Sequence, residues 1–259
     1  MQASQVRVPD ESVDCLDDHG RKVQAMFTTI AHGYDRANRL MSMGTDVRWR
    51  RRSVSTLLDG VPGPDPRTGA GARILDLCAG TLDSTLEIHR RYPQADLVGG
   101  DFSAGMLAHG KARLRGAAAE RITAKEMDAH AIPEPDATFD ALFCAFGVRN
   151  LSDVPTATRD ALRVLKPGGR LVVLEFFRPR RPVTRAFHTV YNSTVLPAVG
   201  WACTGNLDAY LYLPRSIGAF TDLPSYVALL EQEGFEDVES RELTMGVASV
   251  VTARKPEAR

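Results

Sequence analysis

The sequence predicts one doubly wound α/β domain on a mostly parallel sheet, with a helical cap before it and an insertion before its last strands. The first observation is alternation: after residue 70, short apolar runs alternate with longer helical runs, which is typical of βαβ units. The second is an apolar strand that passes through Gly80 into a helix, as ligand-binding turns of such sheets do. The third is length, because 259 residues fit one core with a modest extension.

The expected elements follow in chain order from hydrophobic periodicity and from the Gly- and Pro-rich segments that separate regular structure. Residues 1–20 are polar and acidic, which indicates a flexible tail. Apolar side chains at three- and four-residue steps predict a helical cap over 21–62, with a second helix at 46–58. A Pro- and Gly-rich loop then leads into the core, residues 71–259. The expected strands are 73–77, 95–99, 141–146 and 170–176, and the helices between them are 84–91, 104–114 and 154–165.

An insertion over residues 178–223 interrupts this alternation and carries several aromatic side chains. A helix at 223–232 follows it, with Gly234 as the C-cap. Two final runs, 235–243 and 247–253, suit a terminal β-hairpin.

Composition argues against several classes of protein. Lys+Arg and Asp+Glu are equal at 32 each, so nothing global points to nucleic acid. No apolar stretch reaches the ~18–20 residues of a membrane span, and the start lacks signal-peptide features, so a cytoplasmic location is expected. The four cysteines are widely spaced without a CxxC pair, which argues against zinc and against a disulfide framework. No metal site is therefore expected.

The strongest local signal is the run ILDLCAGTLDS at residues 74–84. Asp76 lies near the end of the strand, and the chain passes through Gly80 and Thr81 into a helix, so backbone N–H groups and a carboxylate converge on one crevice. A nicotinamide dinucleotide fold would favour G-x-G-x-x-G here. Because Leu82 stands where the second glycine of that pattern would follow Gly80, this interpretation is disfavoured.

A second acidic residue, Asp101, ends the next strand in LVGGDFS, about twenty residues beyond Gly80, where a carboxylate can accept both ribose hydroxyls of an adenosine. The alternative role for Asp101 is a helix N-cap, but Ser103 is the better cap for the following helix. Asp128-Ala129 ends a further strand, where an adenine amino group could be met.

In this order, with one motif for each βα unit, these elements resemble the class I S-adenosylmethionine-dependent methyltransferases. The stretch MFTTIAHGYDRANRLMSMGTDVRWRRR, residues 26–52, makes the resemblance more specific, since it is similar to the opening signature of the ubiquinone/menaquinone-biosynthesis C-methyltransferase family. DFSAGML, FGVRN, LPAVG and YLYLPRSIGAF match later motifs of that family. The resemblance implies a seven-stranded Rossmann-like sheet and methylation of a ring carbon of a polyprenyl quinol.

The resemblance also implies S-adenosyl-L-methionine as the cofactor. Together with the strand-end arguments it gives an expected cofactor site of Asp76, Gly80, Thr81, Asp101, Phe102, Asp128, Ala129 and Ala145. Two departures from the family pattern stand out. Leu82 replaces the second glycine of the usual Gly-Thr-Gly-Asp loop, which predicts a side chain near the methionine moiety, and the C-terminal GVASVVTARK lacks the usual histidine.

Methylation of a ring carbon requires that a ring hydroxyl lose its proton. Arg149 and Asn150, just after a strand that ends in the crevice, are expected to stabilise the phenolate. His32, Tyr34 and Tyr191 are expected to orient the acceptor or to relay the proton.

Structural alternatives exist for the same residues. Arg149 could instead pair with Asp153 on the surface, Tyr34 could be core packing, and His32 a solvated loop residue. The basic residues around Trp49 usually mean a solvated face, although they could touch anionic lipid headgroups.

The leading hypothesis is a C-methyltransferase that acts on a demethylmenaquinol or a related polyprenyl quinol. A polyketide or alkaloid methyltransferase of the same fold and a non-catalytic cofactor-binding regulatory protein stay open, because fold alone does not fix function. The expected partner is an aromatic, quinol-like acceptor and not nucleic acid. Peripheral contact with the inner face of a membrane, and a homodimer, are left open.

Overall fold

A computed structural model gives the fold, and the structure describes residues 39, 42–182, 184–186, 191, 194 and 207–257, without the side chains of 207–211. The expected tail, the first helix of the cap, His32 and Tyr34 lie outside the described residues. So do residues 183, 187–190, 192, 193 and 195–206 of the insertion.

Seven strands form one sheet in the order β3-β2-β1-β4-β5-β7-β6. β1 to β5 are parallel, whereas β7 is antiparallel to both β5 and β6. The expected seven-stranded, mostly parallel sheet with a terminal hairpin is thus confirmed. Strand order reverses between β1 and β4, which creates a switch point at their carboxyl ends. The strands are β1 (Arg73–Leu77), β2 (Asp96–Asp101), β3 (Ile122–Glu126), β4 (Phe139–Ala145), β5 (Leu165–Glu175), β6 (Glu236–Leu243) and β7 (Ala248–Arg254).

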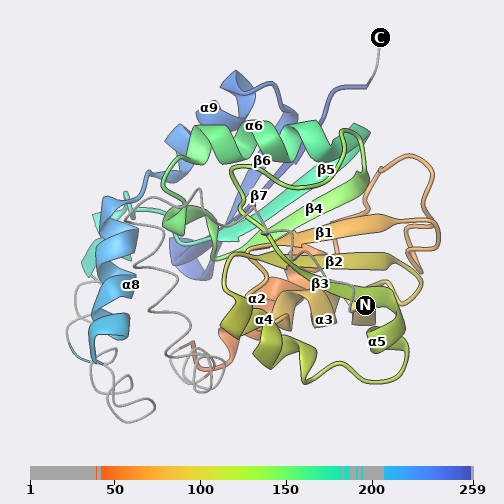
Figure 1. Ribbon diagram of the computed structural model, residues 1–259. Coiled ribbons are helices and arrows are strands. Elements are labelled where there is room, and N and C mark those ends of the chain that lie inside the picture. The colour runs from red at the N-terminus through yellow and green to blue at the C-terminus, as the bar shows by residue number, and fades with distance from the viewer. Residues whose placement is uncertain are drawn as a thin grey trace, which may run out of the picture.

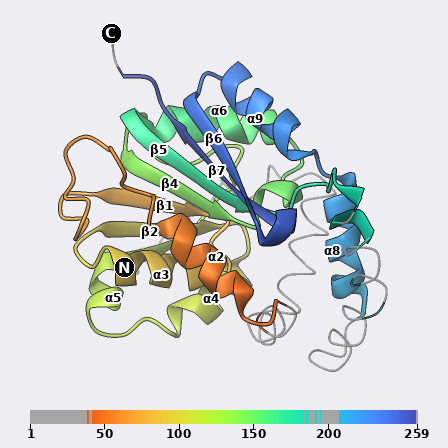
Figure 2. The same ribbon diagram turned by 180° about the vertical axis from the view of Figure 1, so that it is seen from behind.

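Helices cover both faces of the sheet (Figure 1). One face carries α2 (Thr45–Val54), α3 (Asp83–Arg91), α4 (Ala104–Lys111) and α5 (Ala117–Arg121), and the other carries α6 (Val154–Val164) and α9 (Leu223–Gln232). α8 (Leu207–Ala219) lies beyond the carboxyl ends of the parallel strands. Figure 2 shows α2 crossing the face of the sheet beside α3. Two short 3₁₀ helices complete the described elements, η1 (Val148–Asn150) and η2 (Thr244–Gly246).

Several element boundaries differ from those expected, and the two largest differences are at the end of α2 and at the start of β5. α2 ends at Val54 rather than at residue 58, and turns follow it. β5 already begins at Leu165, so the expected Pro-Gly-Gly turn lies inside the strand. The strand accommodates the turn by a shift of register opposite Phe139–Ala141, with Gly168 at φ 73°. That left-handed conformation suits glycine, which lacks a Cβ.

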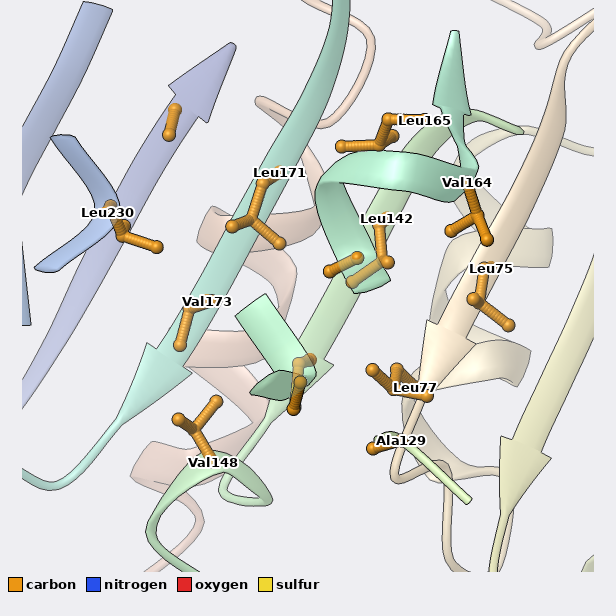
Figure 3. Packing of buried hydrophobic residues seen from close by; sticks show 14 of the residues in the cluster. Leu75, Leu77, Ala129, Leu142, Val148, Val164, Leu165, Leu171, Val173 and Leu230 are labelled. Atoms are coloured by element: carbon orange, nitrogen blue, oxygen red, sulfur yellow. The ribbon is translucent and has the colours of Figure 1, made fainter. Parts of the chain in front are cut away.

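The core divides into two layers because successive strand residues point to opposite faces. In β1, Ile74 packs in the layer that contains Val54 and Ile88, whereas Leu75 and Leu77 pack in the layer of α6 and α9. Figure 3 shows this second layer, with Leu75 and Leu77 among the side chains from β4, β5 and α6. The two layers fix β1 from both sides and so fix the loop that follows it.

Among the helices that the structure describes, none combines the length and the apolar character needed to cross a bilayer.

Candidate cofactor cleft

A cleft opens where the strand order reverses, at the carboxyl ends of β1, β2 and β4. It encloses about 1080 Å³ of empty space, its open mouth included. Its walls are the loops after β1, β2, β3 and β4, together with α2. Six of the expected cofactor residues line it: Gly80, Thr81, Asp101, Phe102, Asp128 and Ala129.

The loop after β1 is shaped by left-handed backbone. Cys78, Gly80 and Leu82 have φ values of 58°, 52° and 65°. The turn brings the Gly80 N–H to the carboxylate of Asp101, to which it donates at 2.8 Å. This bond joins the loop to the end of β2, so two of the expected cofactor motifs form one continuous wall.

Asp101 is buried, and both of its carboxylate oxygens accept backbone N–H groups. Oδ2 accepts from Gly80 and Oδ1 from Ser103, each at 2.8 Å. Burial raises the pKa of Asp101 to about 6. The hydroxyl of Ser103 accepts from the N–H of Met106, so its expected role as the N-cap of α4 is confirmed. Each carboxylate oxygen has a second lone pair, so Asp101 can still accept hydroxyl groups from a ligand.

Asp76 lies behind the loop rather than on the wall of the cleft. It is fully buried on the sheet face below α2 and α3, and its Oδ2 accepts the hydroxyl of Thr85 at 2.5 Å. Its Oδ1 is buried with no hydrogen-bond partner among the described residues. Burial raises the pKa of Asp76 to about 7. Ala145 likewise does not line the cleft.

Asp128 and His130 form the wall after β3. Oδ1 of Asp128 accepts the His130 N–H at 2.9 Å and lies 2.6 Å from Nδ1 of the ring. Because Nε2 of His130 accepts the Asp153 N–H at 3.2 Å, a neutral ring carries its proton on Nδ1 and donates it to Asp128. The hydrogen bond from His130 lowers the pKa of Asp128. Sequence reasoning missed His130, and its position two residues after Asp128 was the only signal.

Arg149 lies beneath the cleft rather than on its wall. Its Nη1 forms an ion pair with Glu175 Oε1 at 2.8 Å and donates to the Phe146 carbonyl at 2.5 Å. The alternative pairing with Asp153 is wrong, because Asp153 caps α6 by accepting the Thr156 N–H. The physical reason is that Glu175 is fully buried at the end of β5, where an unpaired charge would be costly.

Asn150, one residue further, does line the cleft. Its Oδ1 accepts the hydroxyl of Tyr212 at 3.0 Å, and its Nδ2 donates to the Phe146 carbonyl at 3.3 Å. Since Tyr212 belongs to α8, the insertion is tied to the cleft by a side-chain hydrogen bond. Tyr191 is half-buried, which raises its pKa, and it is not among the residues that line the cleft.

The expectation that Leu82 lies near the methionine moiety is wrong. Its side chain is fully buried and does not line the cleft. It fills space left by two glycines: a Cβ added to Gly99 would lie 2.6 Å from its Cδ2, and one added to Gly110 would lie 2.6 Å from its Cγ. Leu82 therefore points into the core between β2 and α4 and not into the cleft.

Two residues of α2, Asp46 and Arg50, line the cleft, and neither was expected there. The basic cluster was expected to be a solvated face, and Arg48, Arg51 and Arg52 are indeed exposed. Arg50 lies on the buried side of the same helix and donates from Nε to Ser84 Oγ at 2.9 Å. The position of Arg50 in the cleft follows from the packing of α2 on α3, which local sequence patterns do not predict.

The hydrogen-bond acceptors of the cleft fit an adenosine-containing ligand, with a buried carboxylate at the end of β2 and another after β3. The fold and the site together define a class I S-adenosylmethionine-dependent methyltransferase. The chain belongs to the ubiE/COQ5 methyltransferase family, whose model matches residues 16–255.

Curated relatives agree with this assignment. The chain is 40% identical to a ubiquinone/menaquinone biosynthesis C-methyltransferase of Geobacter sulfurreducens over 242 residues, which cover 93% of this chain and 91% of the relative. It is 43% identical to a demethylmenaquinone methyltransferase of Thermus thermophilus, over 89% of this chain and 100% of the relative.

Solved structures share the fold at low identity. A methyltransferase of Thermotoga maritima, described as a possible histamine N-methyltransferase, aligns with a TM-score of 0.61 at 16% identity, over 90% of this chain and 99% of that one. A phosphoethanolamine N-methyltransferase of Haemonchus contortus in complex with S-adenosylhomocysteine aligns with a TM-score of 0.59 at 16% identity, over 80% of this chain and 52% of that one. At such identity these likenesses show the fold alone.

Proposed function

We propose that this enzyme transfers a methyl group from S-adenosyl-L-methionine to a ring carbon of a demethylmenaquinol or a related polyprenyl quinol. The observation that carries the proposal is the coupling of the cleft to the insertion, through the Asn150–Tyr212 hydrogen bond. The names of the Geobacter and Thermus relatives support a quinone as the acceptor. Neither a polyketide nor an alkaloid acceptor has comparable support.

The contribution of this chain to the reaction is mainly positional. Bound S-adenosyl-L-methionine supplies an electrophilic methyl group, and holding two reacting atoms at ~3–3.5 Å can contribute as much as ~7–11 kcal/mol. Asn150 lines the cleft beside Phe146 and is the group that we assign to the acceptor's ring hydroxyl. Its amide is held by Tyr212 on one side and by the Phe146 carbonyl on the other.

Arg149 supports the same wall from below. Paired with Glu175, it holds the Phe146 carbonyl and thereby the turn that carries Asn150. We therefore propose that Arg149 favours the phenolate indirectly, by holding the turn that carries Asn150 in place. We propose that one of His32, Tyr34 and Tyr191 accepts or relays the proton that the ring hydroxyl loses.

Peripheral contact with an anionic membrane is part of the proposal, since the acceptor's prenyl tail partitions into lipid. The exposed face of α2 carries Arg48 and Arg52, and Met43 just before it is 83% exposed. Each such arginine near an anionic surface contributes about 1 kcal/mol. Co-sedimentation with anionic but not with zwitterionic vesicles, lost in Arg48→Glu/Arg52→Glu, tests this part.

The central test is a direct assay. The enzyme is incubated with S-adenosyl-L-methionine and a reduced demethylmenaquinone, and the methylated quinone is detected by mass spectrometry. Asp101→Ala serves as the control for cofactor-dependent transfer. Tight binding of S-adenosylhomocysteine without methylation of either a naphthoquinol or a benzoquinol would contradict the acceptor class and leave the cofactor assignment intact.

A further inference from the structure

α2 brings two opposite charges to one end of the cofactor cleft. Asp46 and Arg50 are one helical turn apart, their side chains are only 11% and 13% exposed, and both line the cleft. Residues 79–81, 83 and 84 line the same end, whereas Asp128 and His130 line the wall after β3. The two charges of α2 thus flank the loop after β1.

Hydrogen bonds hold the Arg50 side chain in place but do not use all of the N–H donors of its guanidinium. Its Nε donates to Ser84 Oγ at 2.9 Å, and its Nη1 reaches Asp46 Oδ2 only at 3.4 Å. Within the described part of the chain, the hydrogen bonds of Arg50 use Nε and Nη1 and leave Nη2 available, and Arg50 is the only arginine or lysine on the cleft wall. A guanidinium with two parallel N–H groups is suited to a carboxylate.

The other acidic residue nearby is already neutralised. Asp83 lines the same end of the cleft, but its Oδ1 accepts from Arg113 Nη2 at 2.6 Å. Among the residues that the structure describes, Asp46 contacts Arg50 at 3.4 Å and accepts a hydrogen bond from the Ser42 hydroxyl at 2.5 Å, and no further partner is found. Asp46 is therefore the carboxylate that remains for a cationic group of a ligand.

The charges of the cofactor match this arrangement. Asp101 and Asp128 mark the ribose and adenine ends, so the amino-acid end of S-adenosyl-L-methionine falls beside the loop after β1 and α2. That end is a zwitterion, with one carboxylate and one ammonium group. We propose that Arg50 binds the α-carboxylate and Asp46 the ammonium group of the methionine moiety, so that α2 clamps the cofactor. This inference rests on the cofactor assignment and is independent of the acceptor.

The rest of α2 is built to hold the clamp still. Trp49 Nε1 donates to Thr244 Oγ1 at 2.9 Å, and its ring meets Phe176 edge-on with centroids 6.1 Å apart. These contacts anchor the helix to η2 and to the residue after β5. The cap is thereby part of the cofactor site and not only a cover over the core.

Two ligands separate direct binding from a structural role. S-adenosylhomocysteine has the amino-acid end, and 5′-methylthioadenosine has the same adenosine and thioether without it. By calorimetry, Arg50→Gln and Asp46→Asn should each weaken S-adenosylhomocysteine binding by about ten- to a hundredfold, the cost of a charged hydrogen bond. The affinity for 5′-methylthioadenosine should not change. Arg50→Lys, which keeps the charge, should recover part of the loss.

A third ligand shows which group of the methionine moiety each of the two residues binds. Decarboxylated S-adenosylhomocysteine keeps the amine, so Asp46→Asn should still weaken it whereas Arg50→Gln should not. Arg51→Gln, at an exposed arginine of the same helix that does not line the cleft, is the matched control and should bind all three ligands like the wild type.

Three results would overturn the clamp. Equal losses for S-adenosylhomocysteine and 5′-methylthioadenosine would make both residues structural, and unchanged binding of both ligands would remove α2 from the site. If the wild type bound neither ligand, the cofactor assignment itself would fall, and the clamp with it.

Discussion

The guanidinium of Arg149 and the carboxylate of Glu175 form a 2.8 Å ion pair whose side chains are 4% and 0% exposed. Glu175 also accepts the backbone N–H groups of Arg149 and Phe176. The pair therefore joins the end of β5 to the turn after β4 that also carries Asn150.

Breaking this pair on one side should be costly. Glu175→Gln is expected to lower the free energy of unfolding by about 3–5 kcal/mol, because it leaves a buried guanidinium without its counter-charge. Arg149→Met/Glu175→Gln should lose less than the sum of the two single changes, since the double variant buries no unpaired charge. Urea denaturation of the three variants measures this, and additive losses would show that the two groups act independently.

Cofactor affinity should depend on the charge of Asp101. Its pKa of about 6 lies above the ordinary value because the carboxyl is buried. The ionised form is the stronger acceptor for ribose hydroxyls, so affinity for S-adenosylhomocysteine should fall as pH drops through about 6. Asp101→Asn should bind roughly ten- to a hundredfold more weakly at neutral pH and lose this pH dependence. If the variant keeps the wild-type pH profile, another group is responsible.

Asp76 should make stability depend on pH in a defined direction. Burial raises its pKa in the folded protein to about 7, above the 3.8 of an ordinary aspartate. Its contribution to stability is therefore fully present below pH ~4 and is lost as pH rises through about 7. Asp76→Asn should raise the free energy of unfolding at pH ~8 and leave it nearly unchanged at pH ~4. Denaturation midpoints at the two pH values decide the matter, and a gain at low pH would contradict the assignment.

Leu82 should matter for stability and not for contact with the cofactor. Leu82→Ala is expected to cost about 2–5 kcal/mol in unfolding free energy, because it empties the space between Gly99 and Gly110. Leu82→Gly loses the same packing but relieves the left-handed backbone strain, worth roughly 1–2 kcal/mol, so it should be no less stable than the alanine variant. Calorimetry should find no tighter binding of S-adenosylhomocysteine in either variant. A clear tightening would place the leucine against the ligand after all.

Tyr212 should act on the acceptor side. Tyr212→Phe removes the hydrogen bond to Asn150, worth about 0.5–1.5 kcal/mol. Turnover or KM for the quinol should suffer by up to roughly tenfold on that scale, with unchanged affinity for S-adenosylhomocysteine. Steady-state kinetics in both substrates separates these effects, and a change confined to the cofactor would refute the role given to Asn150.

Much of the fold follows from local patterns in the sequence. β1 and β4 are apolar runs buried on both faces, so their positions could be read directly. β3 was harder to delimit, because it lies at the sheet edge and its sequence ITAKE is largely polar and half-exposed. The start of β5 was missed because its first residues pass through a Pro-Gly-Gly segment that usually marks a turn.

Site residues that directly follow a strand could be predicted from the sequence. Site residues that reach the cleft through contacts between distant segments could not. Asp101 and Asp128 follow strands, so topology alone brings them to the cleft. Arg50 reaches it through the packing of a helix that precedes the sheet, and Arg149 is withdrawn from it by Glu175, 26 residues away. Such pairings depend on tertiary contacts that no local pattern encodes.

The backbone conformation of the loop after β1 affects how such loops can be recognised in sequences and redesigned. Its backbone takes positive φ at three alternate positions, and only one of them, Gly80, is a glycine. The shape of the loop thus depends on the sign of φ at these positions, while the residue at position 82 is set by the room that Gly99 and Gly110 leave on neighbouring elements. A motif scan keyed to glycines alone would pass over this loop. A mutant library that varies position 82 should vary positions 99 and 110 with it, since the three residues share one volume.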